Sequence, residues 1–183
     1  MSNRSDNNKK DSTLAALLKD KPTRGRPRRD VGRHNVYVAL TKEEKKHMRE
    51  LAKKMPDNIV RADIPDLAVT ILTSKLEGLR RAVADRNREI PEGVTDFDSL
   101  YLLWDLPLPI KDTERKWTSI RLSPQEAIEL GRTQGTLNAA FGATRSDTFS
   151  LGLALLTQYL EEIVILPDFA LNEVRNQIIH DLL

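Results

Sequence analysis

The sequence predicts a mainly α-helical protein with short β-strands, in which one chain carries two copies of a strand-helix-helix unit. Three observations predict this fold class. Two short runs, residues 35–40 and 117–122, alternate apolar and polar side chains as a half-buried strand does. Each run leads into a helix-start signal and an amphipathic stretch. A more apolar helical stretch then follows in both places, after the triplets Arg61-Ala62-Asp63 and Arg145-Ser146-Asp147.

Length and composition allow one domain or two small ones. The chain has 183 residues, of which 39% are hydrophobic and 31% are charged, so it can bury a core of modest size. Its net charge of +2 is unevenly distributed, because the first 33 residues carry ten Lys or Arg and four Asp. Such a basic arm predicts a polyanionic partner, either nucleic acid or an acidic membrane surface, with a solubilising tail as the alternative.

Several classes of protein are disfavoured by what the sequence lacks. It contains no cysteine, which excludes disulfides, thiolate metal sites and cysteine nucleophiles. The N-terminus lacks the apolar stretch of a signal peptide, and no run reaches the roughly 18 apolar residues of a membrane span. The three histidines lie far apart, and no phosphate loop, nucleophile elbow or paired carboxylates are recognisable. We therefore expect a soluble cytoplasmic protein that is not an enzyme and has no metal or cofactor.

Residues 1–32 are predicted to form a disordered basic arm. Within it, residues 12–19 contain a helix-start signal and three leucines on one side, in a segment too short to be helical alone in water. We expect this segment to dock on the rest of the protein or on a partner.

The arm also contains Arg24-Gly25-Arg26-Pro27, which resembles an AT-hook, a motif that lies in the minor groove of A/T-rich DNA. Gly25 and Pro27 keep the chain thin and extended, so that two arginine side chains can run along a narrow groove of negative potential. Arg28 and Arg29 would reach phosphates. The alternative interpretation is a basic linker without a groove-binding role.

The first repeat is assigned to residues 33–83. In its strand, Val36, Val38 and Leu40 form the inward row. Thr41 and Glu44 form a capping box that starts a helix ending near residue 55. A second helix is predicted to begin near residue 61 and to continue to residue 83, with a broad apolar face that suits a core helix.

A structured linker is predicted over residues 84–114. Prolines and a glycine mark turns in it, and between them the apolar run 97–104 is expected to form one or two helical turns that pack on another part of the protein.

The second repeat is assigned to residues 115–164. Ser123 and Glu126 are predicted to form a capping box, and Gly142 is predicted to end that helix. Thr144 and Asp147 form a further capping box, which starts a helix expected to reach about residue 164.

Residues 165–183 are assigned to a C-terminal segment. A last amphipathic helix is predicted over residues 168–183, and its buried side is Phe169, Val174, Ile178 and Leu182.

The two repeats align at an offset of about 82 residues, which pairs Thr41 with Ser123 and Glu44 with Glu126. Each repeat resembles a ribbon-helix-helix unit of the MetJ, Arc and CopG type, and the second repeat resembles it more closely. The resemblance implies that two units pair their strands in an antiparallel two-stranded ribbon. In that family the ribbon inserts in the major groove of double-stranded DNA.

The resemblance also implies which residues contact DNA. The outward strand residues would read bases, and the start of each second helix would hold phosphate. The implied base-reading residues are Asn35, Tyr37, Ala39, Trp117, Ser119 and Arg121. The implied phosphate contacts are Arg61 and Ala62 in the first repeat, and Thr144, Arg145 and Ser146 in the second.

Two functions remain open on the sequence alone. The first is sequence-specific DNA binding by a nucleoid-associated protein, which acts as a transcriptional repressor or as a plasmid or phage accessory factor. The repeats would pair within one chain, or between chains in a homodimer or higher oligomer. The second is an antitoxin-like or adaptor protein that binds a protein partner through residues 12–19 or 168–183.

Overall fold

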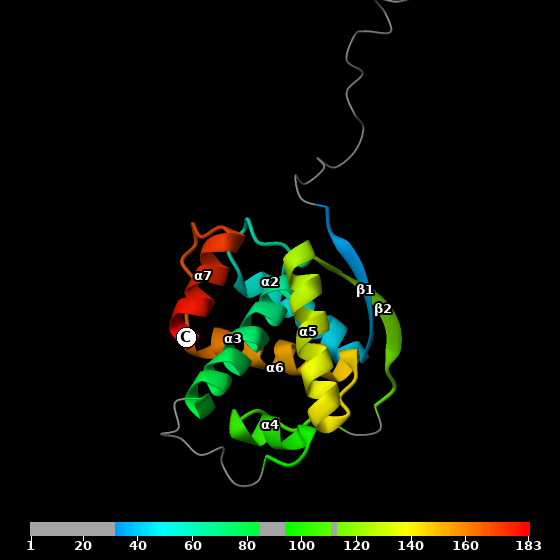
Figure 1. Ribbon diagram of the computed structural model, residues 1–183. Helices are drawn as coiled ribbons and strands as arrows, with labels where there is room; N and C mark the ends of the chain where they lie inside the picture. Colours follow the sequence, from blue (N-terminus) through cyan, green and yellow to red (C-terminus); the bar gives the residue numbers. More distant parts are fainter. Residues whose placement is uncertain (1–31, 85–93, 111–112) are drawn as a thin grey trace, which may run out of the picture. The chain divides into compact units, whose positions relative to one another are not determined.

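The computed structural model describes residues 32–84, 94–110 and 113–183. The predicted short helix at residues 12–19 and the AT-hook-like motif lie outside these residues. The described elements, in chain order (Figure 1), are β1 (His34–Leu40), α2 (Lys42–Lys54), α3 (Ile64–Ala84), α4 (Phe97–Leu103), β2 (Lys116–Leu122), α5 (Pro124–Phe141), α6 (Arg145–Glu162) and α7 (Leu171–Leu182).

The predicted class, mainly helical with short strands, is confirmed. The order of strand, helix, helix and helix occurs twice, first as β1-α2-α3-α4 and again as β2-α5-α6-α7. The apolar run 97–104 forms the predicted short helix, α4, which buries Leu100 and Tyr101. What was expected to be a linker therefore contributes a third helix to the first half of the chain.

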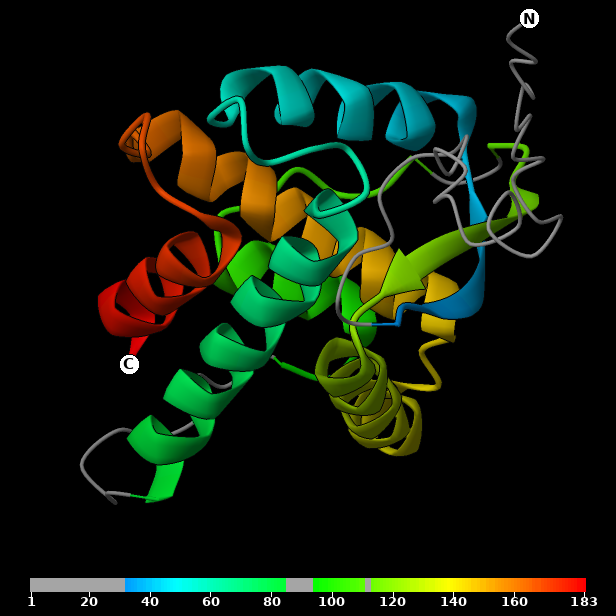
Figure 2. The same ribbon diagram turned by 90° about the horizontal axis from the view of Figure 1, so that it is seen from above.

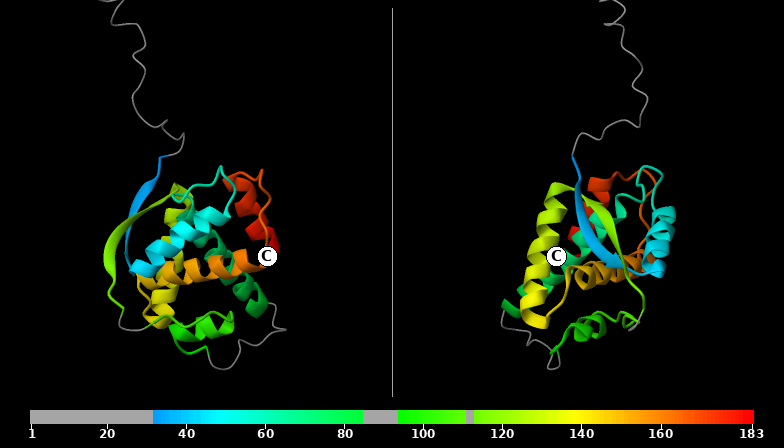
Figure 3. Two further views of the ribbon diagram at one scale, coloured as in Figure 1. Left: turned by 180° about the vertical axis from the view of Figure 1, so that it is seen from behind. Right: turned by 90° about the vertical axis from the view of Figure 1, so that its right-hand side faces the viewer.

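The two strands of this one chain pair with each other in an antiparallel sheet. The register is continuous, from His34 opposite Leu122 to Leu40 opposite Lys116. The right-hand view of Figure 3 shows the strands side by side on one side of the helices, between α5 and α2. Of the two arrangements left open by the sequence, the structure has pairing within the chain.

The inner face of the ribbon is part of the hydrophobic core. Val38, Leu40, Ile120 and Leu122 are all buried, as alternation along each strand predicts. Burying each of these side chains stabilises the fold by about 1.5–3 kcal/mol. A one-residue slip of either strand would turn its two buried side chains toward water, so the core fixes the register and, with it, the outward row.

Helices α3 and α6 pack together behind the ribbon, and α3 runs between α5 and α7 (Figure 2). Their closest approach is at Gly152, where an added Cβ would lie 2.5 Å from the backbone oxygen of Ala68. These two small residues are 84 positions apart, which is the offset between the second helices of the two repeats. Equivalent positions therefore meet where the two helices come closest.

Two of the three predicted capping boxes are present, and one prediction was wrong. Thr41 with Glu44 and Thr144 with Asp147 make both reciprocal hydrogen bonds. Ser123 does not cap α5 with its side chain, since its hydroxyl donates instead to the carboxylate of Glu126. The Ser123 backbone N–H donates to Asp66 Oδ1 at 2.9 Å. The Ser123 N–H, which a capping box would direct to Glu126, is thus bound by a tertiary partner instead.

The second helix of each repeat differs from its predicted limits. Helix α3 begins at Ile64, three residues later than predicted, because the carboxylate of Asp63 accepts the Val60 N–H at 2.8 Å and holds residues 61–63 in a turn. Pro65 then lies in the first turn, where its missing N–H costs nothing. Helix α6 ends at Glu162 rather than near residue 164.

The third helices pack across the two halves of the chain. Helix α7 packs on α3, and it begins at Leu171 rather than at 168. Val174 and Ile178 are fully buried, whereas Phe169 and Leu182 are half-buried. The end of α4 is held to α6 by a hydrogen bond of 2.9 Å from the Gln158 amide to the backbone oxygen of Trp104.

Candidate nucleic-acid interface

The outward face of the ribbon brings the six implied base-reading residues together. Because side chains alternate along a strand, they face outward as three cross-strand pairs. Both aromatic rings are largely exposed, Tyr37 at 63% and Trp117 at 74%, and only Ala39 is half-buried. The pairs are Asn35 with Arg121, Tyr37 with Ser119, and Ala39 with Trp117.

The two ends of this face differ in chemistry. Tyr37 and Ser119, the central pair, are 82 residues apart and thus occupy equivalent positions of the repeats. Toward one end the ribbon presents an amide and a guanidinium, from Asn35 and Arg121. Toward the other it presents a methyl group and an indole, from Ala39 and Trp117. The backbone is close to two-fold symmetric, but its outward chemistry is not.

The N-terminus of α6 lies beside the apolar end of the ribbon. The Ser146 hydroxyl accepts a hydrogen bond from the Ala39 backbone N–H at 2.8 Å, so this strand and helix are in direct contact. The Ser146 side chain is therefore buried in the protein, and only its backbone N–H can serve the implied phosphate contact. Thr144 caps the helix and Arg145 is exposed beside it. The N–H groups of a first helical turn have no acceptor within the helix, and they favour an anion.

The turn before α3 lies beside the polar end of the ribbon. The Arg33 guanidinium donates to the Ala62 backbone oxygen and lies 3.5 Å from that of Arg121. Arg61 is exposed in this turn, but both Arg61 and Ala62 precede the helix. Since Pro65 has no N–H, this helix start has fewer free donors than α6 does.

A matched pair of salt bridges joins each strand to the second helix of its own repeat. Arg33, just before β1, pairs with Asp63 and approaches Asp66 Oδ2 at 3.0 Å. Arg115, just before β2, pairs with Asp147 at 2.6 Å. These bridges were missed in the sequence, although an arginine one or two residues before each strand was a signal that could have indicated them.

Two carboxylates in these bridges, those of Asp66 and Asp147, have pKa values shifted in opposite directions. Burial raises the pKa of Asp66, and the Ser123 N–H and Arg33 compensate only in part. Burial also opposes ionisation of Asp147, but hydrogen bonds from Thr144 and Arg115 outweigh it and lower the pKa of that carboxyl.

Other candidate groups add no further site. His47, one of the three histidines, is half-buried on α2 and lies 2.5 Å from the Thr157 hydroxyl. Within the described ranges, no three His, Asp or Glu residues are arranged to hold a metal ion. Nor is any helix in those ranges long and apolar enough to cross a membrane. The apolar side of α7, a predicted partner-binding region, is already packed within the chain.

Comparison with known proteins gave no match of significance, whether with family models, curated proteins or solved structures. The geometry of the ribbon and of its flanking helices is therefore the basis for assigning a function.

Proposed function

We propose that this protein is a tandem ribbon-helix-helix protein that binds double-stranded DNA in a sequence-specific manner, with the outward face of β1 and β2 in the major groove. One observation carries the proposal: six alternate side chains form a single outward face on a two-stranded ribbon whose other face is core. A major groove about 12 Å wide admits a ribbon of this kind. Exposed aromatic rings at the centre and at one end of the face are also typical of an interaction surface.

The polar end of the ribbon would read purines. Arg121 can donate two hydrogen bonds to guanine O6 and N7, and Asn35 can bond to adenine N6 and N7. Because these residues are directly opposite each other, they would address neighbouring bases of one half-site.

The apolar end would read thymine methyl groups. Trp117 and Ala39 offer only an indole ring and a methyl group as outward chemistry there. A protein with one polar and one apolar end would prefer an asymmetric site over a palindrome. We also expect the phosphate contacts to be stronger at this end, where the first turn of α6 has its free N–H donors.

The N-terminal arm would add affinity through the adjacent minor groove. Arg24 and Arg26 supply the groove-binding side chains, and Arg28 and Arg29 supply further phosphate contacts. In the cell, such a protein would act as a transcriptional repressor or as a plasmid or phage accessory factor, in the cytoplasm and on the nucleoid.

Selection of bound sequences from random duplex DNA tests the proposal. It should be performed with the full chain and with a chain that starts at Asp30. We expect both proteins to enrich one asymmetric motif, and only the full chain to enrich A/T-rich flanking sequence. Bound DNA with no enriched motif would show that the ribbon does not read bases, and failure to bind DNA would overturn the proposed function altogether.

A further inference from the structure

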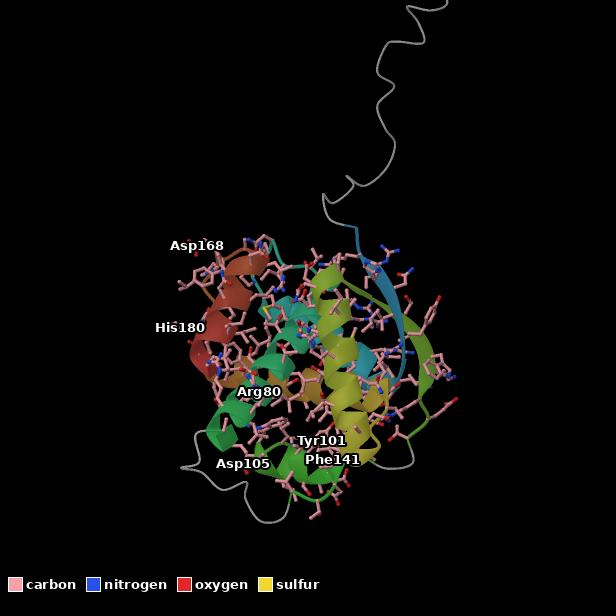
Figure 4. The ribbon with its side chains drawn as sticks, viewed as in Figure 1. Arg80, Tyr101, Asp105, Phe141, Asp168 and His180 are labelled. Carbon is pink, nitrogen blue, oxygen red and sulfur yellow. The ribbon has the colours of Figure 1, made fainter. Side chains whose placement is uncertain are left out.

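Two grooves occupy equivalent places in the two halves of the protein. The first lies between α2 and α6 and has a volume of about 740 Å³. The second lies between α5 and α3 and has a volume of about 550 Å³. Residues from α4 and the loop after it line the first groove, and residues from α7 line the second. Figure 4 labels Tyr101 and Asp105 of the first groove and Arg80 of the second.

The walls of the two grooves correspond residue by residue. On the first helix of each repeat, Glu44 corresponds to Glu126 at an offset of 82. On the second helix, Glu161 corresponds to Glu77 at an offset of 84. The two grooves are therefore equivalent by the repeat. The side chains that occupy the second groove thus indicate which chemical groups could bind in the first.

In the second groove, positive charges match the negative ones. The Arg175 guanidinium of α7 pairs with the carboxylate of Glu126, which is buried. Arg80 pairs with Glu77, and Arg132 pairs with Glu129 at 3.4 Å. This groove holds three carboxylates and three guanidinium groups among its lining residues.

In the first groove, the carboxylates have almost no such partners. Glu44 accepts only neutral donors, the Thr41 N–H at 2.7 Å and the Ser150 hydroxyl. Among the described residues that line it, Lys46 is the one lysine or arginine, and it pairs with Glu50 at 3.6 Å. The described part of the chain contributes six carboxylates to this groove, those of Glu43, Glu44, Glu50, Asp105, Glu161 and Glu162.

We propose that the groove between α2 and α6 is a docking site for a basic, amphipathic segment of a partner protein. The floor supplies apolar contact through Leu106, Leu153 and Ala154, and both walls carry the acidic groups. Glu43 and Glu50 are seven residues apart on α2, about 10 Å along the helix. Acidic groups spread over that length match a chain with several Lys or Arg side chains better than they match a single cation.

Glu126, which is equivalent to Glu44, forms an ion pair with Arg175 in the second groove. An arginine from a partner could form the same ion pair with Glu44 in the first groove. In the first groove Tyr101 lies near the equivalent Glu44, and burial together with that carboxylate raises the pKa of the tyrosine.

Calorimetric titration of the full chain with synthetic peptides tests the site. The probe is a twelve-residue amphipathic helical peptide with Leu on one face and Arg on the opposite face. The control peptide has Glu in place of Arg. Spermine provides a third arm with charge but no apolar face. We expect saturable binding of the basic peptide, none of the acidic one, and binding of spermine at least about tenfold weaker.

Substitutions then locate the site. The variant with Glu43→Gln, Glu161→Gln and Glu162→Gln should lose about tenfold or more in affinity for the basic peptide. A matched variant with Asp57→Asn, Glu129→Gln and Asp168→Asn removes the same charge elsewhere and should bind as the unaltered chain does. Equal losses in both variants, or spermine binding as tightly as the peptide, would overturn the proposal. Five of the six positions are exposed and Glu129 is half-buried, so unchanged far-UV circular dichroism of each variant serves as the folding control.

Discussion

Tyr37 and Ser119 face each other across the ribbon and hold the same position in two repeats that are 82 residues apart. The approximate two-fold axis of the ribbon therefore passes between two unlike side chains. All other outward positions are also unlike their equivalents, since Asn35 corresponds to Trp117 and Ala39 to Arg121. Predictions for the proposed DNA interface can therefore be made separately for each end of the ribbon.

Replacing Arg121 with Ala should cost about 1–3 kcal/mol of binding free energy on the selected DNA site and relax specificity at one position. The reason is loss of a two-point hydrogen bond to guanine at the polar end. Fluorescence anisotropy with single-base variants of the site would measure both effects. Arg132→Ala, an exposed arginine on α5 away from the ribbon, is the control and should leave specificity unchanged.

Replacing Trp117 with Ala should change base preference only at the opposite end of the site. Trp117 and Arg121 are four residues apart on one strand, about 13 Å, so their effects on binding free energy should add within about 0.5 kcal/mol. Anisotropy titrations of both single variants and the double variant would measure this. Strong coupling between the two substitutions would contradict independent reading by the two ends.

Substituting Gly152 with Ala should destabilise the protein by about 1–3 kcal/mol, although alanine is the better helix former. The new Cβ would lie 2.5 Å from the backbone oxygen of Ala68 and would push α3 and α6 apart. Urea unfolding would measure the change. Gly131→Ala is the matched control, since no atom lies within 4 Å of its added Cβ, and it should stabilise by about 0.5–1 kcal/mol.

Asp147→Asn should lower stability at pH 7 by about 1 kcal/mol, with an effect that disappears in acid. The folded pKa of Asp147 lies below its unfolded value, so its ionised form contributes stability above the unfolded value. That contribution is lost as the pH falls from about 4 through the lower, folded pKa. Asp66 acts in the opposite direction, because its raised pKa favours folding as the pH falls.

Urea unfolding of the Asp147→Asn variant and the unaltered chain at pH 7, 4 and 3 would separate these effects, since Asp66 is common to both proteins. The difference between them should narrow steadily below about pH 4. A difference that stays constant to pH 3 would show that the carboxylate charge is not what stabilises the start of α6. Asp168→Asn, at an exposed position, is the control.

Replacing Arg24 and Arg26 with Ala should weaken binding mainly to sites with A/T-rich flanks and should reduce the dependence of affinity on salt. The salt dependence reflects the counterions that DNA releases when the protein binds, and fewer are released when phosphate or groove contacts are lost. Titrations at several salt concentrations, with A/T-rich and G/C-rich flanks, would measure it. Equal losses of affinity for DNA with A/T-rich and with G/C-rich flanks would show that the arm contributes only nonspecific electrostatic attraction.

The sequence could predict the parts of the fold that local patterns determine. Alternation gave the inward rows of both strands, and the Thr41 and Thr144 capping boxes formed as expected. These features depend on residues at most a few positions apart, so no knowledge of tertiary packing is needed. The outward rows followed directly from the same alternation.

Features determined by distant partners could not be predicted in this way. Glu126 was expected to cap α5, but it pairs with Arg175, which is 49 residues away and on another helix. The start of α3 depends likewise on Asp63, whose carboxylate binds both Arg33 and the Val60 N–H. The choice of strand partner was also open, because the residues between the repeats were numerous enough for either arrangement.

The pairing of β1 with β2 in one polypeptide has a consequence for how the protein works when it is scarce. A ribbon assembled from two molecules separates on dilution, whereas strands held on one chain meet at a high effective concentration that dilution does not change. The proposed DNA-binding surface would therefore persist at a few copies of the protein per cell. A single mutation would also alter one end of that surface alone, so the two ends can evolve separately.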